Sequence, residues 1–273
     1  MPVPPEILQL CPLMPKLEAA LAERFTVHRF FEMDDADAFL RDHAQRVRGV
    51  VTGGHLGIPA DLAARLPALE IVAINGVGFD KVDLAEAKRR GVRVSNTPDV
   101  LTEDVADLAI GLVVSVLRQI ARGDAHVRAG LWPSGDLSLG SKVSRRRYGI
   151  FGFGRIGQAV ARRLEGFDAE LAYASRTAVE THVRAVPTLA ELAAWSDVLV
   201  ICASASPETR NIVDASVLDA LGPKGVLVNV ARGSLVDEPA LLDALETGRI
   251  AGAALDVFAD EPRVPERFLA LPN

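Results

Sequence analysis

The sequence predicts an α/β protein with two doubly wound parallel-sheet domains. Its 273 residues exceed the usual size of one domain, which favours two. Short apolar runs alternate with helical stretches, a pattern typical of parallel sheets with helices on their faces. One run, Tyr148–Phe151, breaks into glycines and then resumes with helical spacing, as a strand, tight turn and helix would.

The first domain is expected over residues 1–97. Its expected strands are Ile7–Leu10, Phe25–Phe30, Gly49–Thr52, Glu70–Ile74 and Val92–Ser95. The stretches between them that look helical are Pro15–Glu23, Asp35–Asp42, Pro59–Arg65 and Lys81–Arg90. The pattern is interrupted at Asn96-Thr97-Pro98, because proline biases the preceding residue away from helix. We therefore place a domain boundary there.

The second domain is expected over residues 98–273 and opens with a long apolar helix, for which Thr102 is the N-cap candidate. The apolar run at 108–117 is too short to span a bilayer and favours a buried helix. Residues 127–133 are expected to form a loop. Apolar strands are expected at Leu171–Ala174, Asp197–Cys202, Val226–Val230 and Ile250–Asp256. Helical crossovers between them predict a second doubly wound sheet.

The glycines after Phe151 follow the GxGxxG pattern of dinucleotide-binding turns. Gly152 can adopt the backbone angles of the turn, Gly154 leaves room for a pyrophosphate, and Gly157 lets the helix pack closely on the strand. Arg155 and Ile156 open this helix, whose N–H groups and dipole would face the phosphates. The motif indicates a nicotinamide dinucleotide, against the alternative of an ordinary strand–helix turn.

The residues after the expected strand Leu171–Ala174 should decide whether the site prefers NAD or NADP. In an NAD site an acidic residue about 20 positions after the glycines binds the ribose hydroxyls, whereas an arginine accommodates a 2′-phosphate. Here the strand is followed by Ser175, Arg176 and Thr177, with no carboxylate. We predict a preference for NADPH, with NAD as a second cofactor. The alternative is that Arg176 is a solvated surface charge.

Composition excludes several classes of function. A net charge of −6 and a pI near 5.5 argue against a nucleic-acid surface. Two distant cysteines provide neither a disulfide framework nor a four-ligand zinc site, and no metal is predicted. The first residues, 1–5, do not form a secretory signal. These features predict a cytoplasmic protein without a membrane partner.

Strand ends carry the remaining candidate residues. Thr52-Gly53-Gly54 and Asn75-Gly76 could present backbone N–H groups to a carboxylate, although both could also be plain tight turns. Arg232 and Asp256 each follow an apolar strand, where charged residues border the ligand crevice of such sheets.

Several motifs in order resemble those of the D-isomer-specific 2-hydroxyacid dehydrogenases, most closely the glyoxylate/hydroxypyruvate reductases. They are Ser95–Asp107, the glycine run, Ser206–Arg210, Val228–Glu238 and Leu255–Pro262. The resemblance covers essentially the whole chain. It implies a flavodoxin-like substrate domain followed by a Rossmann dinucleotide-binding domain.

The resemblance also implies residue roles. Arg232 would hold the carboxylate of a 2-oxo acid and polarise its carbonyl. Glu261 would hydrogen-bond the catalytic histidine and favour its protonated form, and Asp256 would accept a hydrogen bond from the cofactor's carboxamide. Thr102 and Ala231 would contact the cofactor.

For the substrate, the resemblance implies main-chain contacts from Thr52, Gly53, Gly54 and Gly76. Trp132 would lie on a dimerisation arm and reach the active site of the neighbouring subunit in a homodimer. From the residues alone, packing of Trp132 on its own domain is an equal alternative.

Two departures from the family pattern are visible. Ser204 stands where the family often has proline. The family's general-acid histidine lies just beyond a Leu-Pro-Asn like Leu271-Pro272-Asn273, and none of the five histidines of this sequence occupies that motif. The family's final helix, which completes the first domain, would also follow. We therefore expect the protein to extend past Asn273.

These observations predict an NADPH-dependent reductase that converts small 2-oxo acids, such as glyoxylate and hydroxypyruvate, to D-2-hydroxy acids. One alternative keeps the fold but changes the hydride donor, as in the related formate and phosphite dehydrogenases. Another alternative is a cofactor-sensing binding protein similar to the family's corepressors. A cofactor-dependent change in partner binding, without turnover, would support it.

Overall fold

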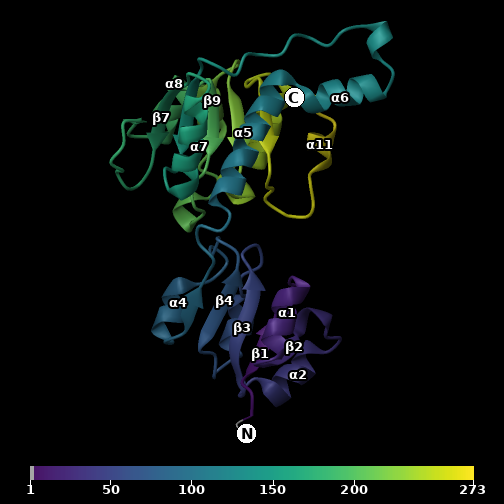
Figure 1. Ribbon diagram of the computed structural model, residues 1–273, viewed down its shortest axis with the longest axis vertical. Helices are drawn as coiled ribbons and strands as arrows, with labels where there is room; N and C mark the ends of the chain where they lie inside the picture. The colour runs from purple at the N-terminus through teal and green to yellow at the C-terminus, as the bar shows by residue number, and fades with distance from the viewer. Residues whose placement is uncertain (1–2) are drawn as a thin grey trace. The chain divides into compact units, whose positions relative to one another are not determined.

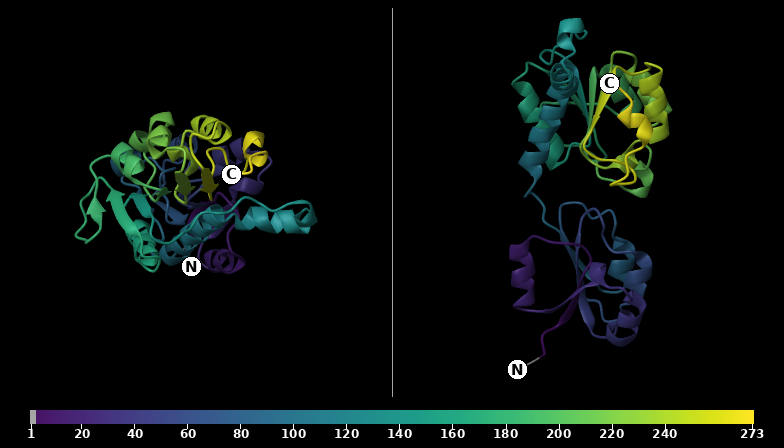
Figure 2. Two further views of the ribbon diagram at one scale, coloured as in Figure 1. Left: turned by 90° about the horizontal axis from the view of Figure 1, so that it is seen from above. Right: turned by 90° about the vertical axis from the view of Figure 1, so that its right-hand side faces the viewer.

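The computed structural model describes residues 3–273. They form two compact units, of which unit 1 ends at Leu101 and unit 2 is Thr102–Asn273 (Figure 1). The division falls slightly beyond the boundary predicted at Pro98. Each unit contains one all-parallel sheet with helices on both faces, which confirms the predicted fold class (Figure 2). Within the described range, no helix combines the length and the apolar character that a membrane crossing requires.

The sheet of unit 1 has the strand order β2-β1-β3-β4-β5, which is the flavodoxin-like order. Its strands are β1 (Glu6–Gln9), β2 (Thr26–Arg29), β3 (Val47–Gly53), β4 (Ile71–Asn75) and β5 (Arg93–Ser95). Its helices are α1 (Pro15–Ala22), α2 (Ala36–His43), α3 (Ala60–Ala64) and α4 (Leu84–Arg89), with the 3₁₀ turn η1 (Phe30–Glu32) after β2. Asp35 and Asp83 cap α2 and α4 by accepting backbone N–H bonds.

The sheet of unit 2 has the strand order β11-β10-β9-β6-β7-β8, which is the Rossmann order. Its strands are β6 (Arg147–Phe151), β7 (Glu170–Ala174), β8 (Arg184–Ala185), β9 (Val198–Ile201), β10 (Val226–Asn229) and β11 (Gly252–Leu255). The central strands β9 and β10 are buried at every position. The two residues of β8 are exposed, so this edge strand lacks an apolar signal in the sequence.

Two groups of helices sandwich this second sheet. Buried side chains of α5 (Thr102–Arg118) and α7 (Arg155–Glu165) pack on one face, and those of α8 (Leu189–Trp195), α9 (Ala215–Leu221) and α10 (Glu238–Glu246) pack on the other. The remaining helical segments are α6 (Ile120–Arg128), α11 (Glu266–Leu269), η2 (Trp132–Ser134), η3 (Pro207–Thr209) and η4 (Gly233–Leu235).

Two local expectations for unit 2 differ from the structure. Thr102 is the first residue of α5 and does not precede the helix as an N-cap. Val127 and Arg128, which were expected in a loop, form the end of α6 because the helical pattern of the preceding residues continues through them.

Candidate functional site

The glycine turn joins β6 to α7, and its three glycines meet different surroundings. Gly152 has φ of 90°, and a Cβ there would lie 2.4 Å from the backbone of Ala203. A Cβ on Gly157 would lie 2.2 Å from the Gly152 carbonyl oxygen. A Cβ on Gly154 would meet no described atom within 4 Å. Two glycines are therefore required by packing, whereas the third borders open space.

The open space at Gly154 fits the pyrophosphate of a dinucleotide. Gly154 is the N-cap of α7, and among the described residues no side chain caps this end of the helix. The first N–H groups of the 11-residue helix, beginning with those of Arg155 and Ile156, therefore lie at the turn together with the positive end of the helix dipole. A phosphate can approach the main chain there without meeting a side chain on Gly154.

The segment after β7 is exposed and lies at the carboxyl edge of the same sheet. Ser175, Arg176 and Thr177 are all solvent-accessible. The pKa of the Glu208 carboxyl, in η3 after β9, is lowered mainly by a hydrogen bond from Ser206, with a smaller contribution from Arg176. Arg176 follows β7 and Glu208 follows β9, and β6 with its glycine turn lies between these two strands. Arg176 therefore acts electrostatically on a loop on the other side of the glycine turn.

The segment that carries Arg232 follows β10 and is held by one buried side chain. Asn229, which is 1% exposed, accepts a hydrogen bond from the Ala231 backbone N–H (3.0 Å) and donates one to the Arg232 carbonyl (2.9 Å). The backbone carbonyl of Asn229 also accepts the Asp256 N–H at 3.0 Å. Asn229 thereby fixes the backbone at Arg232 and at the end of β11 together.

The segment that carries Glu261 packs directly against the Arg232 segment. A Cβ on Gly233 would lie 1.9 Å from the carbonyl carbon of Phe258, so only glycine permits this approach. Glu261 Oε1 accepts the Phe258 N–H at 2.9 Å, and Glu238 Oε1 accepts the Ala259 N–H at 2.7 Å. Two carboxylates thus brace the loop that follows β11.

In unit 1, the glycine segments after β3 and β4 lie against each other. A Cβ on Gly76 would lie 3.1 Å from the Gly54 nitrogen, and one on Gly53 would lie 2.6 Å from the ring of His55. Thr52 is fully buried, and its hydroxyl donates to the Gly57 carbonyl at 2.7 Å. The structure therefore brings Gly54 and Gly76 together at the carboxyl edge of this sheet.

Neither cysteine is activated as a nucleophile. Burial raises the pKa of the Cys202 thiol to about 12 and also raises that of Cys11. Nucleophilic catalysis by a thiolate therefore has no support in this chain.

The two histidines of unit 2 have partners away from Glu261. His126 Nε2 lies 2.9 Å from the Gly135 carbonyl, and His182 Nε2 lies 3.0 Å from Glu165.

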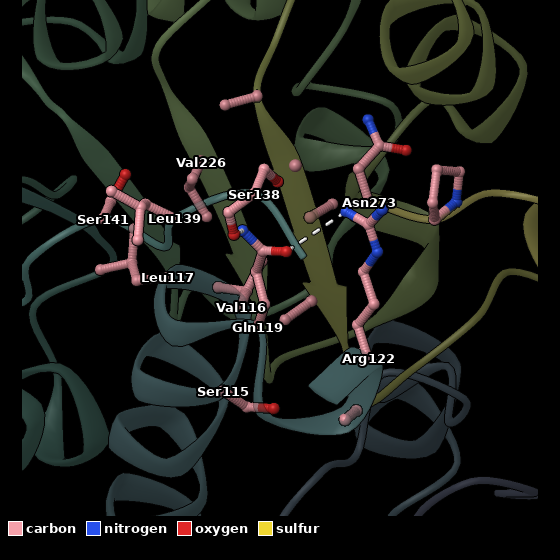
Figure 3. Close-up of a pocket in the computed structure, with 16 residues that line it drawn as sticks. Ser115, Val116, Leu117, Gln119, Arg122, Ser138, Leu139, Ser141, Val226 and Asn273 are labelled. Atoms are coloured by element: carbon pink, nitrogen blue, oxygen red, sulfur yellow. Dashed lines mark hydrogen bonds between the residues drawn. The ribbon is translucent and has the colours of Figure 1, made fainter. Parts of the chain in front are cut away.

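A cavity of about 480 Å³ opens in unit 2 between α5, α6 and β11 (Figure 3). Its lining includes Val226 and Gly252, which begin β10 and β11, together with Gln119 and Arg122, which hydrogen-bond each other at 3.2 Å. Arg232 and Asp256 follow the opposite ends of these strands. The lining also includes Ala253 and Ala254 of β11, but none of the sequence-predicted site residues.

Comparison with known proteins assigns the family. Residues 110–273 match the family described as D-isomer specific 2-hydroxyacid dehydrogenase, NAD binding domain. The chain belongs to the D-isomer-specific 2-hydroxyacid dehydrogenase family. It is therefore an oxidoreductase, and the resemblance predicted from its motifs is confirmed.

Similar members of this dehydrogenase family align over almost the whole chain. The 2-ketogluconate reductase of Gluconobacter oxydans is 46% identical, and glyoxylate/hydroxypyruvate reductase A of Arabidopsis thaliana is 47% identical. Both alignments cover 98% of this chain and 86% of the relative. An NADPH-dependent glyoxylate/hydroxypyruvate reductase of Sinorhizobium meliloti, solved with NADP and malonate, is 45% identical with a TM-score of 0.90, covering 98% of this chain and 84% of its own.

In this dehydrogenase, the structure groups most of the sequence-predicted site residues at strand ends within each unit. Gly152, Gly154, Ala231, Arg232 and Asp256 all lie just after strands of the unit 2 sheet, and Gly157 lies in the first turn of α7. Trp132, by contrast, is 62% exposed on η2, where its Nε1–H donates to Asp136. Sequence reasoning assigned no role to Asn229 or Glu238. A polar residue at the end of a fully buried strand was the available signal for Asn229.

Proposed function

We propose that this dehydrogenase reduces small 2-oxo acids, such as glyoxylate and hydroxypyruvate, to D-2-hydroxy acids, with NADPH as its preferred cofactor. The observation that carries the proposal is the direct packing of the Arg232 segment on the Glu261 segment. Both lie at the edge of a sheet whose glycine turn fits a pyrophosphate. The names of similar proteins support this substrate class over the formate or phosphite donor and over the corepressor alternative.

The chemistry requires a hydride at the carbonyl carbon and a proton at the carbonyl oxygen. Bound NADPH supplies the hydride. The Arg232 guanidinium would pair with the substrate carboxylate and stabilise negative charge that develops on the carbonyl oxygen. Glu261 would orient the general-acid histidine that the family resemblance implies, and Asp256 would bind the carboxamide of the cofactor.

Further contacts are proposed on the same basis. Backbone N–H groups of Thr52, Gly53, Gly54 and Gly76 would bind the substrate carboxylate, and Thr102 and Ala231 would contact the cofactor. Ser175, Arg176 and Thr177 would bind the 2′-phosphate, since their exposure leaves them accessible to a ligand.

Steady-state kinetics with the full-length protein test the proposal. NADPH or NADH oxidation would be measured with glyoxylate, hydroxypyruvate, 2-ketogluconate, hydroxyphenylpyruvate and pyruvate. We expect turnover of the first two, with a higher kcat/KM for NADPH. Arg232→Gln should abolish most turnover, whereas Arg249→Gln, which removes an arginine paired with Asp219, should not. NADPH binding without turnover of any 2-oxo acid would refute the proposal.

We also propose a homodimer formed through the segment of residues 119–141, which extends from the body of unit 2 (Figure 1). It exposes large apolar side chains: Ile120, Val127, Leu131, Trp132 and Leu139. Clustered exposed apolar groups are typical of protein interfaces. Light scattering should give a dimer mass for the wild type and a monomer mass for Val127→Asp. A monomeric wild type would contradict the dimer.

A further inference from the structure

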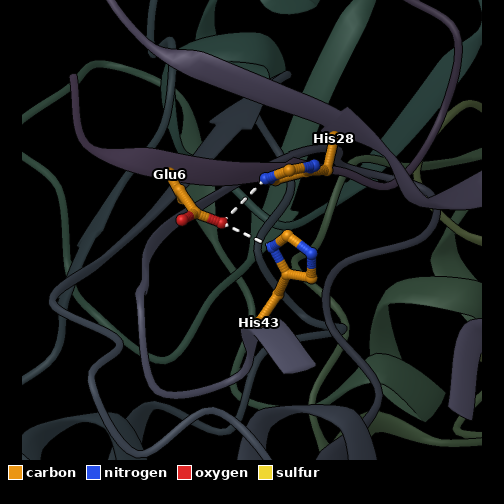
Figure 4. A group of neighbouring side chains, drawn as sticks. All are labelled: Glu6, His28 and His43. Atoms are coloured by element: carbon orange, nitrogen blue, oxygen red, sulfur yellow. Dashed lines mark hydrogen bonds and ion pairs between the residues drawn. The ribbon is translucent and has the colours of Figure 1, made fainter. Parts of the chain in front are cut away.

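Three side chains with metal-ligating atoms converge in unit 1: Glu6 on β1, His28 on β2 and His43 at the end of α2 (Figure 4). Glu6 Oε2 lies 2.9 Å from His28 Nε2 and 2.8 Å from His43 Nδ1. All three atoms lie within 4.8 Å of one another. Glu6 pairs in register with Val47, at the start of β3, so the cluster is roughly a strand length, about 20 Å, from the glycines that follow β3.

The strand register creates this cluster. Leu8 pairs with His28 across the parallel strands, so Glu6, two residues earlier on β1, shares the same sheet face as His28. Phe39 of α2 holds both imidazoles in place. Its ring stacks on that of His43, with centroids 4.3 Å apart, and lies 4.7 Å from that of His28. The side chains of Glu6 and His28 are only 14% and 16% exposed, which limits their alternative positions.

The carboxylate of this cluster lies between the two imidazoles and beside the Arg46 guanidinium. A negative oxygen between two imidazole nitrogens is a ligand set suited to a divalent transition ion.

One contact in the cluster cannot be satisfied by the side chains alone. His43 Nδ1 lies 2.8 Å from Glu6 Oε2, which only accepts, and 2.9 Å from Arg46 Nη2, which only donates. Whether Nδ1 carries a proton or a lone pair, one of its two neighbours is mismatched. The Arg46 side chain is 56% exposed and can turn toward solvent, while its Nε bonds the other oxygen, Glu6 Oε1.

We propose that Glu6, His28 and His43 bind one divalent transition-metal ion, with Zn²⁺ as the preferred metal. The ion would accept the lone pairs of Glu6 Oε2, His28 Nε2 and His43 Nδ1 and displace Arg46 Nη2, which removes the mismatched contact. Tetrahedral zinc places such atoms roughly 3.3 Å apart, so Glu6 Oε2 would move about half an ångström away from each imidazole nitrogen. The two imidazole nitrogens, which lie within 4.8 Å of each other, would have to reach the same spacing. Water would complete the coordination. Mg²⁺ is disfavoured because it prefers oxygen ligands.

Zinc at this site would join three elements of unit 1. β2 is an edge strand of its sheet and has no buried residue, and it contributes His28 to the proposed zinc site. The ion would tie this strand to β1 and to the end of α2. Binding only to the folded protein would then raise the melting temperature.

The test uses the full-length protein after treatment with EDTA. Zn²⁺ binding would be measured by calorimetry, Co²⁺ binding by its visible absorption, and the melting temperature with Zn²⁺ or Mg²⁺. We expect one saturable Zn²⁺ site, a Co²⁺ spectrum with nitrogen ligands, and a higher melting temperature with Zn²⁺ but not with Mg²⁺. Absence of saturable Zn²⁺ binding in the wild type would overturn the proposal.

Variants assign the ligands. His28→Ala and His43→Ala should each weaken Zn²⁺ binding by at least about tenfold, because even supporting partners of a metal ligand contribute that much. The matched control, His182→Ala, removes a histidine that contacts a single carboxylate, Glu165, and should leave binding unchanged. Arg46→Ala should bind Zn²⁺ more tightly, because the competing cation is gone. If His43→Ala bound as well as the wild type, the cluster would be an ion-pair network without a metal.

Discussion

Replacing Gly154 with alanine separates the packing of the glycine turn from its proposed binding of cofactor. Gly154 has φ of −77° and ψ of −159°, which alanine also adopts, and its Cβ would meet no described atom within 4 Å. The free energy of unfolding should therefore change by less than about 0.5 kcal/mol. It could rise slightly, because alanine restricts the unfolded chain more than glycine does.

The same methyl group would stand where the pyrophosphate must approach the main chain. We expect Gly154→Ala to raise the Kd for NADPH by about tenfold or more, which corresponds to roughly 1.4 kcal/mol of lost binding free energy. Gly157→Ala is the matched variant. Its Cβ would lie 2.2 Å from the Gly152 carbonyl oxygen and 3.2 Å from Ile150 Cγ2, so α7 would have to move away from β6. Overpacking of this kind costs about 1–3 kcal/mol of folding free energy.

Urea denaturation followed by circular dichroism would measure the stability of both variants, and fluorescence titration would measure NADPH binding. Gly154→Ala should lose affinity but keep its stability, whereas Gly157→Ala should lose stability. If Gly154→Ala bound NADPH as tightly as the wild type, the turn would be a structural strand–helix connection only. Equal destabilisation of the two variants would refute the assignment of open space at Gly154.

Three further predictions concern other parts of the molecule. Asn229→Ala should lower the free energy of unfolding by about 1–3 kcal/mol in urea and reduce kcat/KM with glyoxylate, because it removes the side-chain hydrogen bonds to the partly buried Ala231 N–H and Arg232 carbonyl; unchanged kinetics would contradict its positioning role. Arg176→Gln should lower kcat/KM for NADPH roughly 10- to 100-fold and leave that for NADH nearly unchanged; equal losses would exclude a 2′-phosphate contact. With EDTA present, Glu6→Gln should be less stable than the wild type above pH 4.5, and the difference should disappear as the pH falls toward 2. The sign follows because the pKa of Glu6 is depressed from 4.5 to about 2 in the folded protein. The ionised carboxylate therefore stabilises the folded state above pH 4.5, and this stabilisation is lost as Glu6 is protonated. A stability difference that does not depend on pH would contradict this.

Much of the fold could be predicted because its signals are local. Apolar runs the length of a strand, separated by helical stretches, predict two parallel sheets without any knowledge of which strands pair. Gly152, Gly154 and Gly157 lie within one turn of chain, so their spacing alone indicates the geometry of the strand–helix connection. Exposed β8 has only two residues and no apolar pattern, so the same reasoning could not find it.

Identification of the candidate site required both the sequence motifs and the tertiary structure. Arg232 and Glu261 were identifiable from sequence motifs, but their packing depends on the contact of Gly233 with the Phe258 backbone. Asn229 and Glu238 brace these segments through hydrogen bonds that depend on the positions of β10, β11 and α10. Such positions are set by packing of the whole core, which a local pattern does not contain.

The periodicity and glycine spacing of the sequence by themselves determined two doubly wound sheets and a dinucleotide turn, because the responsible interactions join residues close in the chain. Only the tertiary structure decided that Glu6 meets His28 and His43, which lie 22 and 37 residues away. Their meeting depends on the register of β1 against β2 and on the packing of α2. A shift of one residue in that register would turn one partner to the opposite face of the sheet.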